Sequence, residues 1–154
     1  MKKNIIEISY LLLIALTIGA TFTLGILVAP VVFNMSDISK FASGQVMSEI
    51  FIRYNYLLNL SVFFITIVEV REYLRFNRDK IVLLSAFFSV TTALLFTLYY
   101  TPFIIQAQQI GVSATETSAF EGMHKGLVID FKILLVSIMV LFVRKIYLLN
   151  RGEK

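Results

Sequence analysis

Four long apolar runs constrain this chain more than any other feature of its sequence. They extend over about 5–33, 54–70, 81–105 and 123–143. A helix of about 20 apolar residues crosses the hydrocarbon core of a bilayer and satisfies its backbone hydrogen bonds internally. Hydrophobic residues make up 58% of the 154 residues, more than the roughly 45–50% of soluble domains. The sequence therefore predicts an all-α integral membrane four-helix bundle, formed as a single domain over 1–154.

Basic residues gather at alternate connections between these runs. The amino terminus, the second connection and the carboxyl end carry Lys2, Lys3, Arg71, Arg75, Arg78, Lys80, Arg144, Lys145, Arg151 and Lys154. The other two connections hold only Lys40, Arg53 and Lys125. Because Lys and Arg mark the cytoplasmic side of a membrane protein, we expect both termini in the cytoplasm. The net charge of +4 is then a signal of topology, and nucleic acid is not an expected partner.

Small residues recur at every fourth position along one face of the first span. They are Thr17, Thr21, Gly25 and Ala29. Helices in lipid associate through the close backbone approach that small side chains allow. We expect this face to pack against another span, with a homo-oligomer or a membrane partner as the alternative. Near the outer end of the span, Pro30 is expected to kink or end the helix, with regular helix ending near Phe33.

The first outer connection has a helical pattern of its own over 40–53. Apolar residues recur there at Phe41, Val46, Ile50 and Phe51, and Glu49 stands four residues before Arg53. The pattern predicts a short amphipathic helix on or partly within the outer interface. The alternative is an N-terminal extension of the second span. The third connection, 106–121, predicts an irregular turn, with Thr117 or Ser118 as the cap of the last helix.

Five polar residues toward the outer side of the predicted bundle form a candidate binding site. They are Arg53, Asn55, Asn59, His124 and Asp130. Ionisable groups inside spans are costly, and they are usually paired or functional. His124 is the only histidine; it has the chemistry to ligate a metal, relay a proton or make a structural hydrogen bond.

Asp130 lies six residues after His124, about 9 Å deeper along a helix. Its expected partner is Arg53, Asn55 or Asn59, and a transport or proton role is the alternative. Lys132 points to nearly the opposite side of the helix, at about 100° per residue. It is therefore expected to extend toward the outer interface instead of pairing with Asp130.

Thioether and imidazole groups at the outer end suggest a soft-metal site. Its candidate ligands are Met35, Met47, Met123 and His124. Such ligands suit Cu(I), although methionine is also common in apolar packing. A single histidine excludes a bis-histidine haem within one chain, and the absence of cysteine from the sequence excludes thiolate chemistry. Since no catalytic motif is present, an enzyme has no positive support.

Four short strings of the sequence resemble one family. They read GILVAPVVF at 25–33, ASG at 42–44, IFIRYN at 50–55 and FEGMH at 120–124. In this order they resemble the bacterial inner-membrane family known only as domain of unknown function 4149, whose eukaryotic relative is transmembrane protein 205. The resemblance implies a four-helix protein of the bacterial inner membrane with no settled activity. The relative's association with platinum-drug resistance implies export, trafficking or soft-metal handling. Family members often carry a small hydroxyl residue and an Asn after the His, where this chain has Asp130 and Lys132.

These features favour a transporter, or a transport or resistance accessory, for a small solute or metal ion. Two alternatives stay open. The first is a structural or partner-binding membrane subunit, which the small-residue face supports. The second is a haem- or metal-dependent membrane redox protein, which would use His124. The sequence requires no cofactor, and copper and haem are the two that its residues suggest. The lipid bilayer is the expected surrounding.

Overall fold

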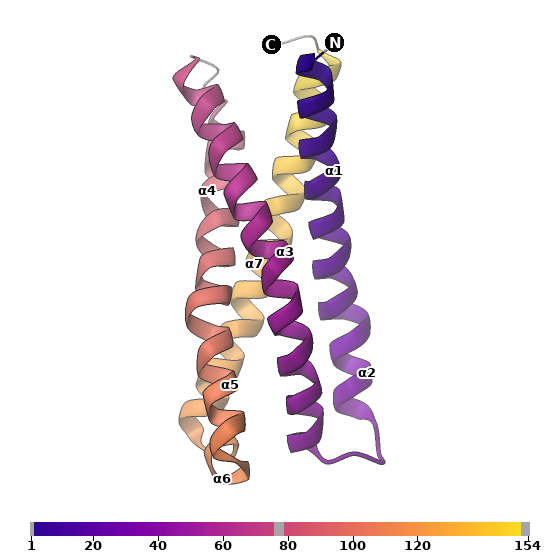
Figure 1. The fold of residues 1–154 in the computed structure, drawn as a ribbon, viewed down its shortest axis with the longest axis vertical. Coiled ribbons are helices and arrows are strands. Elements are labelled where there is room, and N and C mark those ends of the chain that lie inside the picture. The colour runs from indigo at the N-terminus through magenta and orange to yellow at the C-terminus, as the bar shows by residue number, and fades with distance from the viewer. Residues whose placement is uncertain (1, 76–78, 152–154) are drawn as a thin grey trace.

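The computed structural model describes residues 2–75 and 79–151, and over these residues it is helical, without strands. Four helical columns are long and apolar enough to cross a membrane: Ile5–Asn34, Lys40–Leu74, Lys80–Ile110 and Ser118–Asn150. This confirms the all-helical fold with four candidate spans. Figure 1 shows an elongated bundle with both chain ends at one end, here called the terminal end; the opposite one is the distal end. Arg78 and Lys154, counted above as basic residues, lie outside the described residues.

Each of the two prolines follows a short π-helical segment. The first column is α1 (Lys2–Phe22), η1 (Thr23–Val28) and α2 (Ala29–Asn34), and the third is α4 (Lys80–Leu95), η2 (Phe96–Tyr100) and α5 (Thr101–Ile110). A proline cannot donate to the carbonyl one turn earlier, and its ring collides there. The wider π turn relieves this conflict, and Thr101 Oγ1 donates to the Phe96 carbonyl at 2.8 Å. The helix therefore continues past Pro30 to Asn34, close to the expected end.

α3 (Lys40–Leu74) is one uninterrupted helix. Ser39 caps it, its Oγ accepting from the Ala42 amide at 3.2 Å. Residues 40–53 are therefore the N-terminal extension of the second span, and the separate amphipathic helix is not found there. The physical reason is that no proline interrupts this stretch, and extending a helix costs far less than starting a new one. At 1.5 Å per residue α3 is about 52 Å long, so it projects beyond a core of about 30 Å.

The third connection is more regular than its polar sequence suggests. α5 ends at Ile110, and Gly111 follows it with a φ of 116°, which favours glycine. A single-turn helix, α6 (Val112–Thr115), follows. Thr117 then caps α7 (Ser118–Asn150), with Oγ1 accepting from the Phe120 amide at 3.2 Å. Of the two expected caps, Thr117 is therefore the one used.

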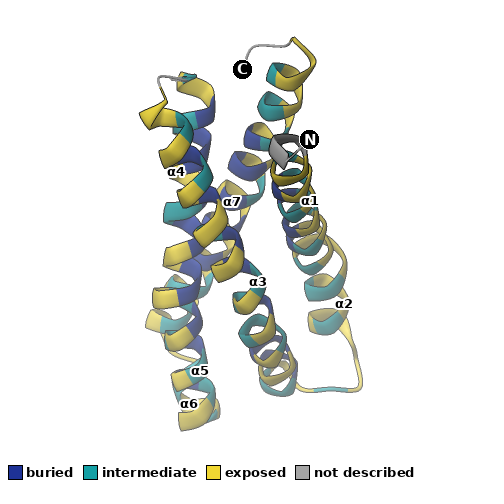
Figure 2. Cartoon of the chain, turned by 45° about the horizontal axis from the view of Figure 1, so that its top comes forward, coloured by how far each residue is buried: buried dark blue, intermediate teal, exposed yellow. Residues whose placement is uncertain are grey.

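Figure 2 shows the buried residues facing the interior of the bundle and the exposed residues on its outside. Many of the exposed residues are large and apolar, and many of the buried ones are small and polar. Leu98, for example, is 71% exposed, whereas Thr17 and Thr21 are fully buried. Thr17 Oγ1 lies 2.6 Å from Ser61 Oγ, and Thr21 Oγ1 lies 2.5 Å from the Tyr54 hydroxyl. Such contacts let helices approach closely in lipid. The small-residue face of the first span thus packs against α3 within the chain at these two threonines.

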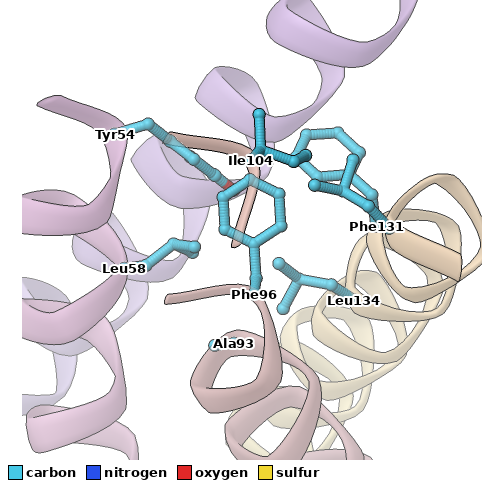
Figure 3. Close-up of a cluster of buried hydrophobic side chains, with 8 residues drawn as sticks. Tyr54, Leu58, Ala93, Phe96, Ile104, Phe131 and Leu134 are labelled. Atoms are coloured by element: carbon cyan, nitrogen blue, oxygen red, sulfur yellow. The ribbon is translucent and has the colours of Figure 1, made fainter. Parts of the chain in front are cut away.

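Two apolar clusters fill the bundle. The distal cluster comprises Tyr54, Leu58, Ala93, Phe96, Ile104, Leu127, Phe131 and Leu134. The terminal cluster comprises Tyr10, Ile14, Ile65, Val82, Ala86, Ile138 and Leu141. In the distal cluster, Figure 3 shows Phe96 between Tyr54 and Phe131, with ring centroids 5.7 and 5.5 Å away. A larger residue at Gly25 would crowd this cluster, because a Cβ there would lie 2.7 Å from Phe131 Cε1 and the ring would have to shift.

Two ion pairs join the helices near the terminal end. Glu69 of α3 binds Lys145 Nζ of α7 at 2.8 Å and accepts from the Tyr10 hydroxyl of α1 at 2.6 Å. Asp79 caps α4 by accepting from the Val82 amide at 3.0 Å, and it binds Arg144 of α7 at 2.6 Å. These pairs fix α7 against the other three columns.

Replacing Asp79 by Asn tests its ion pair while keeping a residue that caps helices well. The hydrogen bonds from Arg144 lower the pKa of Asp79 below its ordinary value of 3.8. A carboxyl group whose pKa is lowered by folding adds stability above that ordinary value, and the added stability is lost as pH falls through the lowered pKa. We expect Asp79→Asn to be less stable by about 1 kcal/mol at pH 7, with the gap closing below about pH 4. Thermal unfolding of the native protein and the variant in detergent at pH 7 and pH 3 measures this difference in stability. A difference at pH 3 as large as that at pH 7 would contradict the prediction.

Candidate functional site

A pocket of about 270 Å³ lies at the distal end, between α2, α3, α5, α6 and α7. We call it the distal pocket. Its lining includes Phe33, Gly44, Met47, Phe51, Gln108, Glu116, Phe120 and His124. Aromatic and aliphatic groups dominate, and a few polar groups converge among them. This combination is typical of sites for small molecules.

His124 lies in the second turn of α7, where its imidazole packs between two phenylalanine rings. It stacks on Phe120 with an interplanar angle of 10° and a centroid distance of 6.5 Å. Phe33 of α2 meets it edge-on at 6.1 Å. The side chain is half-buried, and none of the described residues hydrogen-bonds to it. The ring is thus held in place by packing, which leaves its nitrogens available to a ligand.

Gln108 of α5 supplies an acceptor without a donor. Its amide lies so close to the α3 backbone that a Cβ on Gly44 would collide with Gln108 Nε2. Its Oε1 is buried and has no hydrogen-bond partner among the described residues. A buried polar atom normally has a partner. A hydrogen-bond donor on a bound molecule, or a water, would supply the one that Gln108 lacks.

Two further acceptors without donors lie deeper in the bundle. Asp130 is 5% exposed and its Oδ2 has no partner among the described residues; the same holds for the buried Oδ1 of Asn55. Each lies about 20 Å from the distal end of its helix. A buried carboxylate without a partner is costly unless it gains a proton, a water or a cation. Asp130 is not part of the distal-pocket lining.

The structure distributes the five predicted site residues over different surroundings. Arg53 and Asn59 are exposed on α3, Asn55 is half-buried and Asp130 is buried. Of the five, His124 alone lines the distal pocket. No hydrogen bond among the described residues joins Asp130 to its three expected partners.

The four candidate metal ligands are also divided. Met47, which is 2% exposed, lines the distal pocket with His124. Met35 is 50% exposed at the end of α2, and Met123 is half-buried outside the pocket lining. Within 2–75 and 79–151, no group of three or more His, Asp or Glu side chains is placed to hold a metal ion. Of the four candidate ligands, Met47 and His124 are the two that line the same pocket.

Sequence reasoning missed the residues that shape the pocket around His124. Gln108 belongs to the polar string QAQQ at the end of the third apolar run, and polar residues at that place predict the start of a turn. In the sequence, Phe33 marks the expected end of a helix and belongs to a family-like string, and Phe120 belongs to another such string. The signal available in the sequence was Gln108 itself, an amide shortly after the end of an apolar run that could continue as helix.

One comparison with known proteins gave a match. The family model described as Domain of unknown function (DUF4149) matches residues 12–113, more than half of the chain. The matched region runs from α1 into α6 and ends before α7, which carries His124 and Asp130. No curated protein and no solved structure matched.

Proposed function

The chain belongs to the family of the domain of unknown function DUF4149, and we propose that it transports a small solute or serves a transporter as an accessory subunit. The single observation that carries this proposal is the distal pocket, in which His124 and the free acceptor of Gln108 share an aromatic lining. In this proposal the chain acts as one four-helix domain over 1–154. The lipid bilayer surrounds its apolar exterior.

The chemistry of the pocket favours a solute with an apolar body and a hydrogen-bond donor. The donor would satisfy Gln108 Oε1, and the body would pack against Phe51 and Phe120. Small amines and alcohols have this chemistry, and because Glu116 and Lys40 both line the pocket, its charged groups do not favour one sign of charge on the solute. The acceptors of Asn55 and Asp130 supply deeper positions for a proton or a cation during transport.

A metal ion is the second candidate, because Met47 and His124 line the same pocket. Thioether and imidazole are suitable ligands for Cu(I). These two ligands fall short of a closed four-coordinate set, so a third ligand would come from Gln108, Glu116 or the transported species. Haem, the other cofactor that the sequence suggests, does not fit this pocket, because a volume of about 270 Å³ is below the roughly 300–1,000 Å³ of sites for drug-sized ligands.

The proposal also places the protein in a bacterial inner membrane with both termini cytoplasmic. Both termini lie at one end of the bundle (Figure 1). Lys80, Arg144, Lys145 and Arg151 lie toward that end, and Lys40 and Lys125 lie toward the other. Because basic residues mark the cytoplasmic side, the distal pocket would face the periplasm.

Filling the pocket tests the proposed function. Thr115, which is half-buried, lines the pocket from α6, so Thr115→Trp should occupy its space. The matched control is Ser113→Trp, on the exposed side of the same short helix. Purified protein is screened by thermal unfolding against small amines, Cu(I) and Zn²⁺. At 100 times its Kd, a bound solute should stabilise the native protein and the Ser113→Trp variant by about 2.7 kcal/mol, and Thr115→Trp not at all.

Flux measurements then separate the two forms of the proposal. The stabilising solute is loaded into vesicles that contain the native protein, the control variant or Thr115→Trp. Flux in vesicles with the native protein and the control variant, but not with Thr115→Trp, indicates a transporter. Binding without flux indicates an accessory subunit. Stabilisation of Thr115→Trp equal to that of the control would refute the distal pocket as the binding site, as would a screen in which no solute stabilises the native protein.

A further inference from the structure

A long apolar groove lies between α4 and α7, on the outside of the bundle. One part has a volume of about 490 Å³ and is lined by Leu84, Phe88, Lys132, Ile133, Val136 and Val140. A second hollow shares Val136 and Val140 and extends the groove to Tyr147. From Lys132 to Tyr147 the groove follows α7 for about 22 Å. Its walls are strongly exposed, with Leu84 at 62% and Val136 at 61%.

Small polar residues form the floor of this groove. Ser85 and Ser137 line it, and both are buried. Ser137 also accepts a hydrogen bond from Ser89 Oγ at 3.0 Å, which holds α4 against α7. Small residues on a helix surface let the backbone of another helix approach closely in lipid. The length, apolar walls and small-residue floor together match the shape of a transmembrane helix.

Among the described residues, Lys132 is the one charged residue that lines the first hollow, and its aliphatic stem forms that part of the wall. Its side chain is exposed, and it makes no ion pair or hydrogen bond with any described residue. It lies about 21 Å from the distal end of α7, a helix about 50 Å long, and so close to the middle of the bilayer. Its stem spans about one helical turn, too little to reach an interface from that depth. An ammonium group at that depth is costly, and an acidic partner is one of the ways in which membrane proteins offset that cost.

We propose that this groove docks a transmembrane helix of a different membrane protein, and that this helix carries an Asp or Glu at mid-bilayer depth opposite Lys132. A lipid headgroup does not provide the carboxylate, since headgroups stay at the interface. A second copy of the chain does not provide it either. A two-fold contact through the groove would bring Lys132 toward Lys132, and Asp130, the carboxylate at this depth, is buried. The proposal is independent of the distal pocket.

A synthetic helix tests the charge pairing directly. The probe is a fluorescent leucine-rich transmembrane peptide with one central Glu, compared with peptides carrying Gln or Lys there. Energy transfer to labelled protein in phosphatidylcholine vesicles reports binding. We expect the Glu peptide to bind about tenfold more tightly than the Gln peptide. Lys132→Met should remove that difference, and Lys132→Glu should transfer the preference to the Lys peptide.

A steric variant separates docking in the groove from a general attraction between charges. Val136→Trp fills the groove while keeping Lys132, and it should abolish binding of the Glu peptide. Ile129→Trp, at an equally exposed position of α7 outside the groove lining, should leave binding unchanged. Equal binding of the Glu and Gln peptides would overturn the proposal, and so would binding that survives both Lys132→Met and Val136→Trp.

Discussion

Replacing Glu69 by Gln is expected to destabilise the folded protein by about 3 kcal/mol, because it leaves the ammonium of Lys145 buried without a counter-ion. The two side chains are 7% and 15% exposed, and they lie 2.8 Å apart. Gln keeps an acceptor for the Tyr10 hydroxyl, so the loss reports the charge and not the hydrogen bond. Unfolding by denaturant in detergent micelles measures the difference in free energy.

The double variant Glu69→Gln/Lys145→Met provides the decisive comparison. With no buried charge left unpaired, it should recover most of the stability lost in the single variant. Glu49→Gln, at an exposed position of the same helix, should change stability by less than about 0.5 kcal/mol. A loss in Glu69→Gln no larger than that in Glu49→Gln would mean that the pair contributes nothing measurable.

The second large effect is expected at Phe96, which has no exposed surface and lies among three other rings. Its ring centroid is 5.2 Å from that of Phe51, 5.7 Å from Tyr54 and 5.5 Å from Phe131. Phe96→Ala should cost about 3 kcal/mol, near the lower limit for buried phenylalanines. The lower limit applies because the unfolded reference in lipid is also apolar, so lost packing contributes and transfer from water does not.

The matched control for Phe96→Ala is Phe87→Ala, which removes the same atoms from the same column. Phe87 is 62% exposed on the outside of α4. Its loss should cost less than about 1 kcal/mol. The same denaturant titration serves both variants, and equal losses would show that the rings around Phe96 do not pack tightly.

The distal cluster and the contacts around Glu69 also define what transport would require. A solute in the distal pocket is separated from the terminal end first by the Tyr54, Phe96 and Phe131 rings and then by the Tyr10–Glu69–Lys145 contacts. A transporter must therefore open both, whereas an accessory subunit needs neither to move. The π segments η1 and η2 lie beside the distal cluster, and such segments are frequently found at functional sites.

Some contacts were within reach of sequence reasoning. The spacing of Thr17 and Thr21 predicted a packed face, and the structure buries both threonines. Thr117 was one of two expected caps because side-chain caps depend on local chain geometry alone. The ion pair of Glu69, by contrast, could not be predicted from local sequence. Its partner Lys145 is 76 residues further along the chain, and only the rotation and depth of α3 and α7 bring them together.

The sequence by itself determined that this chain forms four membrane-length helices, because run length against bilayer thickness and internal backbone hydrogen bonding are local properties. Only the tertiary structure decided which faces turn inward. In water the hydrophobic effect buries the apolar face of a helix and exposes the polar face. In lipid an apolar residue is equally suited to the core, where Phe96 lies, and to the exterior, where Phe87 lies. The positions of Gln108 in the distal pocket and of Lys132 on the groove therefore followed from helix packing, which the apolar pattern does not encode.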